Sequence, residues 1–160
     1  TPATVCLAVP LYEQVEQLKQ NYKAVLSGII AGTLTSLCSI LLLAIAFNIP
    51  HEAYVSLLPK SITTPIGIGV SNELGGFVPV TVVSIVITGV LGNVIAEQFL
   101  KFLRIDNPIA KGIAIGTSSH AAGTAKALEM GEIEGAMSGL AIVVAGLITV
   151  VGATLFSLLY

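Results

Sequence analysis

Residues 25–47, "VLSGIIAGTLTSLCSILLLAIAF", decide the fold class, because these 23 consecutive positions hold no charged side chain. An α-helix rises 1.5 Å per residue, so a run of this length crosses the roughly 30 Å hydrocarbon core of a bilayer. Two further uncharged windows, 74–96 and 135–160, have the same character. The first few residues of 74–96 are expected outside the membrane, which leaves a span near 77–96. The sequence therefore predicts three long transmembrane helices.

The composition of the whole chain agrees with a membrane protein. The hydrophobic fraction of the 160 residues is 54%, charged residues make up 10%, and the mean hydropathy is +0.94. An ordinary soluble domain is about a quarter charged, so too few charges remain here to cover a soluble core. The net charge of −2 and the lack of a basic stripe argue against a nucleic-acid partner. We expect one integral membrane domain over residues 1–160.

Three other apolar segments are too short to cross the membrane. They lie at 1–12, 61–72 and 112–125, and each contains helix-weakening proline or glycine residues. Non-helical backbone survives at membrane depth only where protein or a water-filled cavity satisfies its polar groups. Short, interrupted segments of this kind are the best sequence pointer to a transporter binding site. We expect broken or re-entrant half-helices here.

The broken segments resemble one another. "TPATVCLAVP", "TTPIGIGVSN" and "SSHAAGTAKA" each open with hydroxyl residues, and each leads through a short polar stretch into a long span. This pattern predicts an internal repeat, although small polar residues also cluster in membrane chains without one. The predicted fold is thus an all-α integral membrane protein in which long transmembrane helices alternate with broken half-helices.

The basic residues of the connections constrain the topology. The connections at 13–24 and 97–111 together carry five of them, whereas the connection at 48–60 carries only Lys60. If 61–72 enters the membrane and returns to the same side, both basic connections face one side, which is then the cytoplasmic side. If 61–72 crosses instead, the distribution becomes mixed. We favour the re-entrant topology.

Three stretches of the sequence resemble the LrgB/CidB family. They are "TPATVCLAVPLYEQ" (1–14), "LLPKSITTPIGIGVSNELGG" (57–76) and "GTSSHAAGTAKALEMGEIEGAMSGLA" (116–141). The likeness covers essentially all 160 residues, and it implies that the N-terminal helices of the family precede this piece. Gly69 stands where some members carry an acidic residue, so a scheme that needs a carboxylate inside 61–72 is not supported.

The resemblance implies two functions and does not choose between them. Bacterial members are antiholin-like and act with a small LrgA/CidA-type membrane partner on murein hydrolase export and autolysis. Plastid relatives resemble glycolate/glycerate translocators, and some bacterial members are associated with pyruvate movement. The implied location is the bacterial cell membrane, or the plastid inner envelope for a plant protein. A homo-oligomer, in which further copies of the chain are the partners, is also compatible with the resemblance.

Physical reasoning favours transport of a small organic anion, with the antiholin-like role as the alternative. Such an anion needs a positive potential and hydroxyl donors, which helix N-termini at "KSITTP" and "GTSSH" would supply. A polar side chain held at membrane depth is a functional hypothesis by default. The predicted substrate-binding residues are Lys60, Ser61, Thr63, Thr64, Ser118, Ser119, His120, Thr124 and Lys126.

Several of these residues have a purely structural alternative. His120 could pack between helices and bond a carbonyl group. Lys60 could extend its ammonium group to the membrane interface. Thr63 and Thr64 could simply cap a half-helix ahead of Pro65.

The sequence gives no support for an enzyme, a cofactor or a metal site. "GIGVSN" (67–72) begins like a dinucleotide fingerprint, but Asn72 replaces the third glycine. "GTSSH" has His120 where a nucleophile elbow requires glycine. Two histidines and two distant cysteines offer too few ligands for a metal ion. We therefore predict no catalytic residues.

Overall fold

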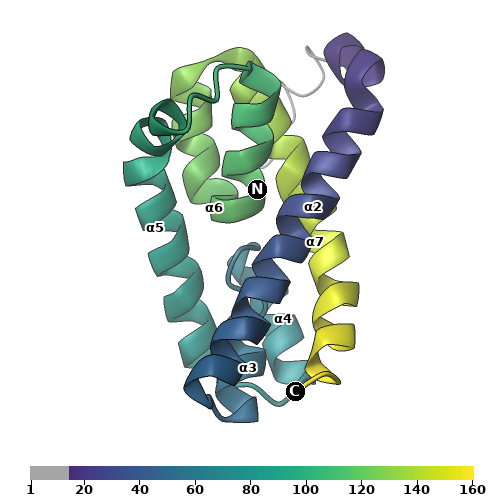
Figure 1. Cartoon of the computed structure of the whole chain (residues 1–160), viewed down its shortest axis with the longest axis vertical. Helices are drawn as coiled ribbons and strands as arrows, with labels where there is room; N and C mark the ends of the chain where they lie inside the picture. The colour runs from purple at the N-terminus through teal and green to yellow at the C-terminus, as the bar shows by residue number, and fades with distance from the viewer. Residues whose placement is uncertain (1–14) are drawn as a thin grey trace.

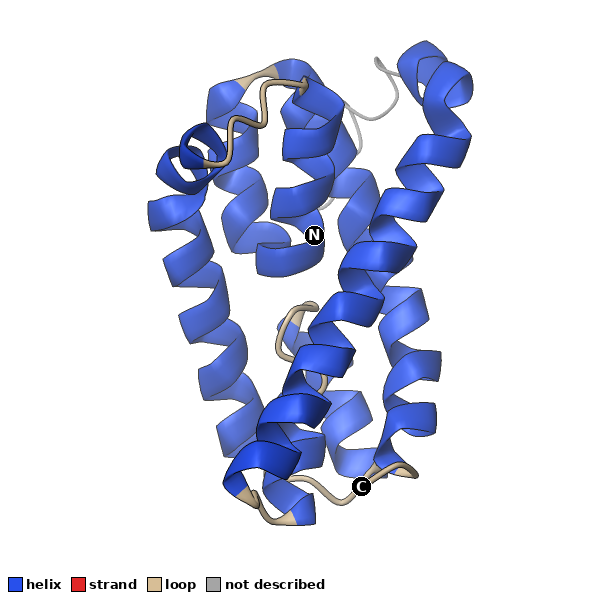
Figure 2. Cartoon of the chain, in the orientation of Figure 1, coloured by secondary structure: helices blue, strands red, loops and turns tan. Residues whose placement is uncertain are grey.

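The fold was analysed in a computed structural model that describes residues 15–160. The predicted broken segment at 1–12 lies outside these residues. Every regular element within 15–160 is a helix, which confirms the all-α prediction (Figure 2). The helices are α2 (Val15–Phe47), α3 (His51–Leu57), α4 (Thr64–Glu73), α5 (Val78–Phe102), α6 (Pro108–Met130) and α7 (Glu132–Ser157).

Three helices are long and apolar enough to cross a membrane. The candidate spans are Lys19–Phe47 in α2, Val78–Phe102 in α5 and Glu132–Ser157 in α7. Their large side chains stay exposed along much of their length, as Leu42 at 66% and Leu147 at 69% show. Exposed apolar surface of this extent suits contact with lipid rather than with water. The prediction of an integral membrane protein with three long apolar helices is confirmed.

The first long helix begins earlier than the sequence pattern suggested. We expected a connection at 13–24 and a span near 25–47, but α2 is already helical at Val15. The reason is that "VEQLKQNYK" (15–23) is rich in glutamate, glutamine, leucine and lysine, which are good helix formers. The polar residues there do not end the helix, and the candidate span within it begins at Lys19.

Two helical hairpins fill the space between the long helices (Figure 1). The α3–α4 hairpin comprises residues 51–73 and reverses direction through turns at 58–63. The α6 hairpin comprises residues 108–130 and reverses at His120, whose φ of 43° and ψ of −142° are not helical. Its two arms pack together, since a Cβ atom on Gly123 would meet Ile115 and Ser119 of the first arm. The break that we expected within 112–125 is this reversal.

The hairpins enter from opposite ends of the molecule (Figure 1). Helix α2 begins at the upper end of that view, where α5 ends and α6 begins and ends. Helices α3 and α4 lie at the lower end, near the C terminus, and the loop that joins them rises toward the middle (Figure 2). The reversals of both hairpins therefore lie in the interior of the molecule, away from its two ends.

The α6 hairpin packs closely on the last long helix. A Cβ atom on Gly112 would meet the backbone of Glu134, and one on Gly116 would meet the backbone of Ser138. Glycine at both positions thus lets the first arm of α6 approach α7 without side chains between the two backbones, as is common where helices pack in membranes.

Candidate functional site

The tip of the α3–α4 hairpin carries a lysine bonded to two serines. The Nζ atom of Lys60 donates to Ser61 Oγ at 3.0 Å and to Ser36 Oγ of α2 at 3.3 Å. The two serine oxygens are themselves 3.3 Å apart. Lys60 donates only to neutral hydroxyl oxygens here, so its positive charge has no carboxylate partner in this cluster. Such a charge attracts an anion.

Helix α4 begins directly after this tip. Thr63 is its N-cap residue in extended conformation, and no side chain caps the helix there. Capping by the Thr63 hydroxyl, the structural alternative for that residue, is therefore not seen. The first turn contains Pro65, and the helix starts in the interior of the molecule, so the positive end of its dipole lies there (Figure 1).

The tip of the α6 hairpin is held by α5. The Nε2 atom of His120 lies 3.0 Å from the carbonyl oxygen of Ile85, and Asn93 Nδ2 donates to the carbonyl oxygen of Ala122 at 2.8 Å. A carbonyl group only accepts hydrogen bonds, so the His120 nitrogen that faces Ile85 carries a proton. The second arm of α6 starts immediately after His120. Its N-terminal end, like that of α4, points into the molecule.

Close approach of α5 to this tip depends on small residues. A Cβ atom on Gly89 would meet the His120 ring, and one on Gly92 would overlap with the Ser119 side chain. The hydroxyl oxygens of Ser118 and Ser119 are 3.1 Å apart beside these contacts. Asn93 and the two glycines therefore place the serine pair against α5.

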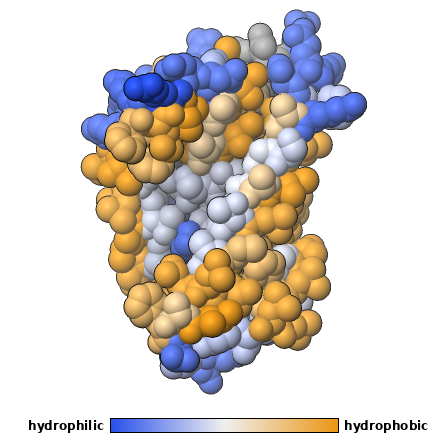
Figure 3. All heavy atoms as spheres, in the orientation of Figure 1, coloured by the Kyte–Doolittle hydropathy of each residue, from blue (hydrophilic) through white to orange (hydrophobic). Residues whose placement is uncertain are grey.

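The two tips contribute to one cavity of about 440 Å³ between α5 and the first arm of α6. Lys60 from the first hairpin, Ser118 and Ser119 from the second, and Thr88 from α5 line it together with apolar residues. In the space-filling view, a pale and partly hydrophilic hollow interrupts the apolar surface at mid-height (Figure 3). The structure thus brings three predicted site residues together, and Ser61 joins them through its bond to Lys60.

Other predicted site residues lie elsewhere. Thr124 is fully buried, with its hydroxyl oxygen 2.7 Å from that of Ser138 and 2.9 Å from the carbonyl oxygen of His120. Lys126 pairs with Glu97 and Glu129, each at 3.2 Å, near the end of the second arm of α6. Thr63 and Thr64 are partly buried at the start of α4 and do not line the cavity.

Two polar residues of the candidate site, Ser36 and Thr88, were not predicted from the sequence. Both lie in the long uncharged windows, whose length and lack of charge indicate a membrane span but do not single out individual hydroxyl groups. The rule that a polar side chain at membrane depth is a functional hypothesis would have selected them.

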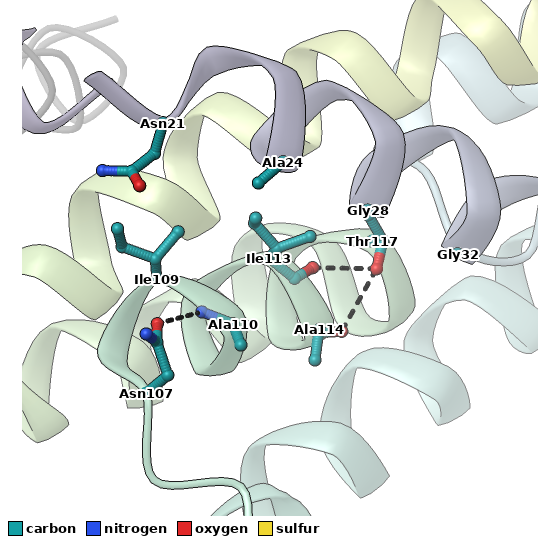
Figure 4. A pocket seen from close by; sticks show the side chains of 10 residues that line it. All are labelled: Asn21, Ala24, Gly28, Gly32, Asn107, Ile109, Ala110, Ile113, Ala114 and Thr117. Atoms are coloured by element: carbon teal, nitrogen blue, oxygen red, sulfur yellow. Dashed lines mark hydrogen bonds between the residues drawn. The ribbon is translucent and has the colours of Figure 1, made fainter. Parts of the chain in front are cut away.

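Two further cavities are distinct from this site. One of about 470 Å³ lies between α2 and α6 (Figure 4). Its described lining, which includes Gly28, Gly32 and Thr117, contains no charged side chain and none of the predicted site residues. The Thr117 hydroxyl group donates to the carbonyl oxygens of Ile113 and Ala114. The other, of about 270 Å³, surrounds the ion pairs of Lys126. Neither joins the two hairpin tips.

No metal-ligand cluster occurs within residues 15–160, since no three histidine, cysteine, aspartate or glutamate side chains gather there.

The model of the LrgB-like family matches residues 1–159. An antiholin-like protein LrgB from Bacillus cereus (strain B4264) is 38% identical over 155 residues, which cover 97% of this chain and 67% of that protein. The antiholin-like protein LrgB from Bacillus anthracis (strain A0248) matches with the same identity and coverage. No solved structure matches the chain.

Proposed function

The chain belongs to the LrgB-like family, and on this premise we propose that it serves as an antiholin-like protein of a bacterial cell membrane. The names of the two Bacillus relatives support this role more directly than any other. The partner that we propose is a small LrgA/CidA-type membrane protein, and the process is the control of murein hydrolase export and autolysis. The exposed apolar faces of α2, α5 and α7 offer surface for such an assembly.

A second function, the carriage of a small monocarboxylate such as glycolate, glycerate or pyruvate, is favoured by one observation. Lys60, Ser118 and Ser119 come from opposite hairpins and line one cavity. The ammonium group would bind the carboxylate, and the serine hydroxyl groups would bond its oxygens or a neighbouring hydroxyl or keto oxygen. A regulator that acts only through assembly has no need of this arrangement.

The remaining predicted residues take supporting roles in this proposal. The helix start at Thr63 and Thr64 adds positive potential near the tip of the α3–α4 hairpin. His120 holds the α6 hairpin at its reversal, and Thr124 fixes the second arm to α7. Lys126 ties that arm to α5 through Glu97 and does not bind the substrate.

The proposed orientation places the start of α2 in the cytoplasm. Lys19 and Lys23 lie near that start, and Lys101, Arg104 and Lys111 lie where α5 ends and α6 begins, at the same end of the molecule (Figure 1). Because basic residues accumulate on the cytoplasmic side, this end faces the cytoplasm. The cavity extends along α5 to Leu103 and Ile105 and thus toward that side.

The test compares the two lysines in proteoliposomes. Uptake of labelled glycolate and pyruvate is measured for the full-length protein, for Lys60→Gln and for the matched control Lys126→Gln, with and without the small partner. We expect Lys60→Gln to lower uptake at least tenfold, because a lost charged hydrogen bond is worth about 1.5–3 kcal/mol. Lys126→Gln should keep most of it. Chromatography and circular dichroism check that both variants insert and fold.

The same variants separate the two functions in cells. If Lys60→Gln still restores normal autolysis in a deletion strain and no protein takes up either acid, the carrier function is wrong and the antiholin-like role stands alone. If autolysis control and uptake are lost together in Lys60→Gln, carriage is part of that role.

A further inference from the structure

The cavity lined by the two hairpin tips is polar at one end and mostly apolar along the rest of its length. Lys60, Thr88, Ser118 and Ser119 form the polar end. From there the wall continues along α5 through side chains such as Leu91, Ile95 and Phe99, and it ends at Leu103 and Ile105. One cation therefore stands at the polar end of a mostly apolar groove.

The groove is larger than a short hydroxy acid requires. It measures about 440 Å³. The fifteen helical steps from Thr88 to Leu103 correspond to about 22 Å along α5. Glycolate or pyruvate would fill only the polar end and would leave the apolar wall without a ligand contact.

The helices of this chain leave the apolar wall half-exposed, so lipid or a ligand covers it. Leu91, Ile95 and Phe99 are 53%, 49% and 54% exposed, although each lines the groove. An aliphatic chain laid against them would bury this surface, and each buried methylene group stabilises a complex by up to about 0.8 kcal/mol.

We propose that this groove binds amphipathic monocarboxylates of the fatty-acid type, with the carboxylate on Lys60 and the serine hydroxyl groups and the aliphatic chain along α5. The proposal rests on the carrier function proposed above, because both use Lys60 to bind the anion. It changes the preferred substrate from a short hydroxy acid to an acid with an extended apolar chain.

Charge selects this ligand over a neutral one. Lys60 is the charged side chain among the described residues that line the groove. A neutral lipid chain or an apolar helix in the groove would leave that ammonium group without an anion at membrane depth, which is costly. A dicarboxylate would bring a second negative charge that finds no cation there. A single carboxylate on an apolar chain satisfies both ends.

The test is a chain-length series measured by isothermal titration calorimetry on the full-length protein in nanodiscs of neutral lipid, with empty nanodiscs as the baseline. Acetate, butyrate, hexanoate and octanoate are compared with the alcohols of the same lengths. We expect the affinity of the acids to rise up to about fourfold per methylene group. The alcohols should bind at least tenfold more weakly, and Lys60→Gln should remove the difference between acids and alcohols.

A groove-filling variant tests the position of the chain. Ala96 lines the groove, so Ala96→Leu places a larger side chain where the aliphatic chain would lie. It should flatten the series beyond butyrate and leave acetate unchanged. Ala31→Leu on the exposed surface of α2 is the matched control and should change neither.

The outcomes are distinguishable. Short acids that bind without any gain from added methylene groups overturn this proposal and leave the carrier function intact. Alcohols that bind as tightly as acids, or a series unaffected by Ala96→Leu, also overturn it, because the groove is then a general lipid contact or not the site. Failure of every acid in the series to bind overturns this proposal, and uptake of glycolate and pyruvate in the proteoliposome test then decides the carrier function separately.

Discussion

The α3–α4 hairpin and the α6 hairpin reach the interior from opposite ends, but they are built differently. The first reverses through turns at 58–63 and carries the charge of Lys60 at its tip. The second reverses at His120, has no charged side chain at its tip and carries Lys126 and Glu129 on its second arm near the end of the molecule. The first thus presents a charge to the cavity, and the second presents hydroxyl groups.

The packing of the two hairpins differs as well. In the α6 hairpin, a Cβ atom on Gly116 would collide with the Ser138 carbonyl group of α7. In the α3–α4 hairpin, a Cβ atom on Gly69 would meet nothing within 4 Å. The α6 hairpin is therefore fixed against a long helix along its first arm, whereas α4 keeps an open face.

Leucine substitution at these two glycines should produce the largest contrast. Gly116→Leu should destabilise the protein by about 3 kcal/mol or more, because overpacking against backbone cannot be relieved by a change of rotamer. Gly69→Leu should be neutral or slightly stabilising, since glycine costs up to about 1 kcal/mol in a helix relative to better helix formers. Unfolding in sodium dodecyl sulfate, followed by circular dichroism, measures both.

Equal loss of stability in the two variants would show that α4 packs as closely as α6, on another chain or another copy. Equal tolerance would instead remove the close contact between α6 and α7.

The sequence predicted the long helices and the existence of broken segments, because both follow from the length of uncharged runs and from the positions of proline and glycine. It did not predict which residue reverses the α6 chain. Gly116 and Gly123 are the obvious candidates for positive φ. The reversal falls on His120 because Ile85 and Asn93 of α5, distant in sequence, bond that stretch.

The structure brings only some of the predicted site residues together, for a similar reason. Lys60, Ser118 and Ser119 lie at or beside the two chain reversals. Because both reversals lie in the interior of the molecule, these residues come together in space. Lys126 lies six positions beyond His120, which is about 9 Å along a straight helical arm. Short sequence distance was the reason to group Lys126 with "GTSSH", but the second arm leads away from the tip and Lys126 does not line the cavity. The internal repeat stays a prediction.

Substitution of His120 tests the one-residue reversal, with an intermediate expected effect. His120→Ala should cost about 1–3 kcal/mol, because a residue with a Cβ atom then keeps φ at 43° without the bond to Ile85. His120→Gly should cost about 1 kcal/mol less, since glycine adopts positive φ without strain. Thermal unfolding in detergent compares the two variants. An alanine variant as stable as the glycine variant would mean that the backbone at position 120 is not strained.

A smaller effect should come from two buried hydroxyl pairs, one for each hairpin. Ser71 of α4 lies 2.7 Å from Thr81 of α5, and Thr124 of α6 lies 2.7 Å from Ser138 of α7. Each pair joins the second arm of a hairpin to the next long helix. Double-mutant cycles with Ser→Ala and Thr→Val should give coupling energies of about 0.6 kcal/mol for each pair, the usual value inside membranes. Coupling in one pair and none in the other would show that the hairpins are not attached in the same way.

The smallest effect should come from the ion pairs on the second arm of the α6 hairpin. Lys126 joins that arm to α5 through Glu97, whereas Lys101 pairs with Glu97 within α5 and is 74% exposed. Exposed pairs contribute little, and salt screens them. Lys126→Ala should therefore lower the melting temperature slightly at low salt and not at high salt, while Lys101→Ala should change it in neither condition. A salt-independent loss for Lys126→Ala would mean that its aliphatic stem, and not its charge, holds the arm. In that case Lys126 would hold the second arm of the α6 hairpin by packing alone. Of Lys60 at the tip of the α3–α4 hairpin and Lys126 near the end of the α6 hairpin, only Lys60 would then act through its charge.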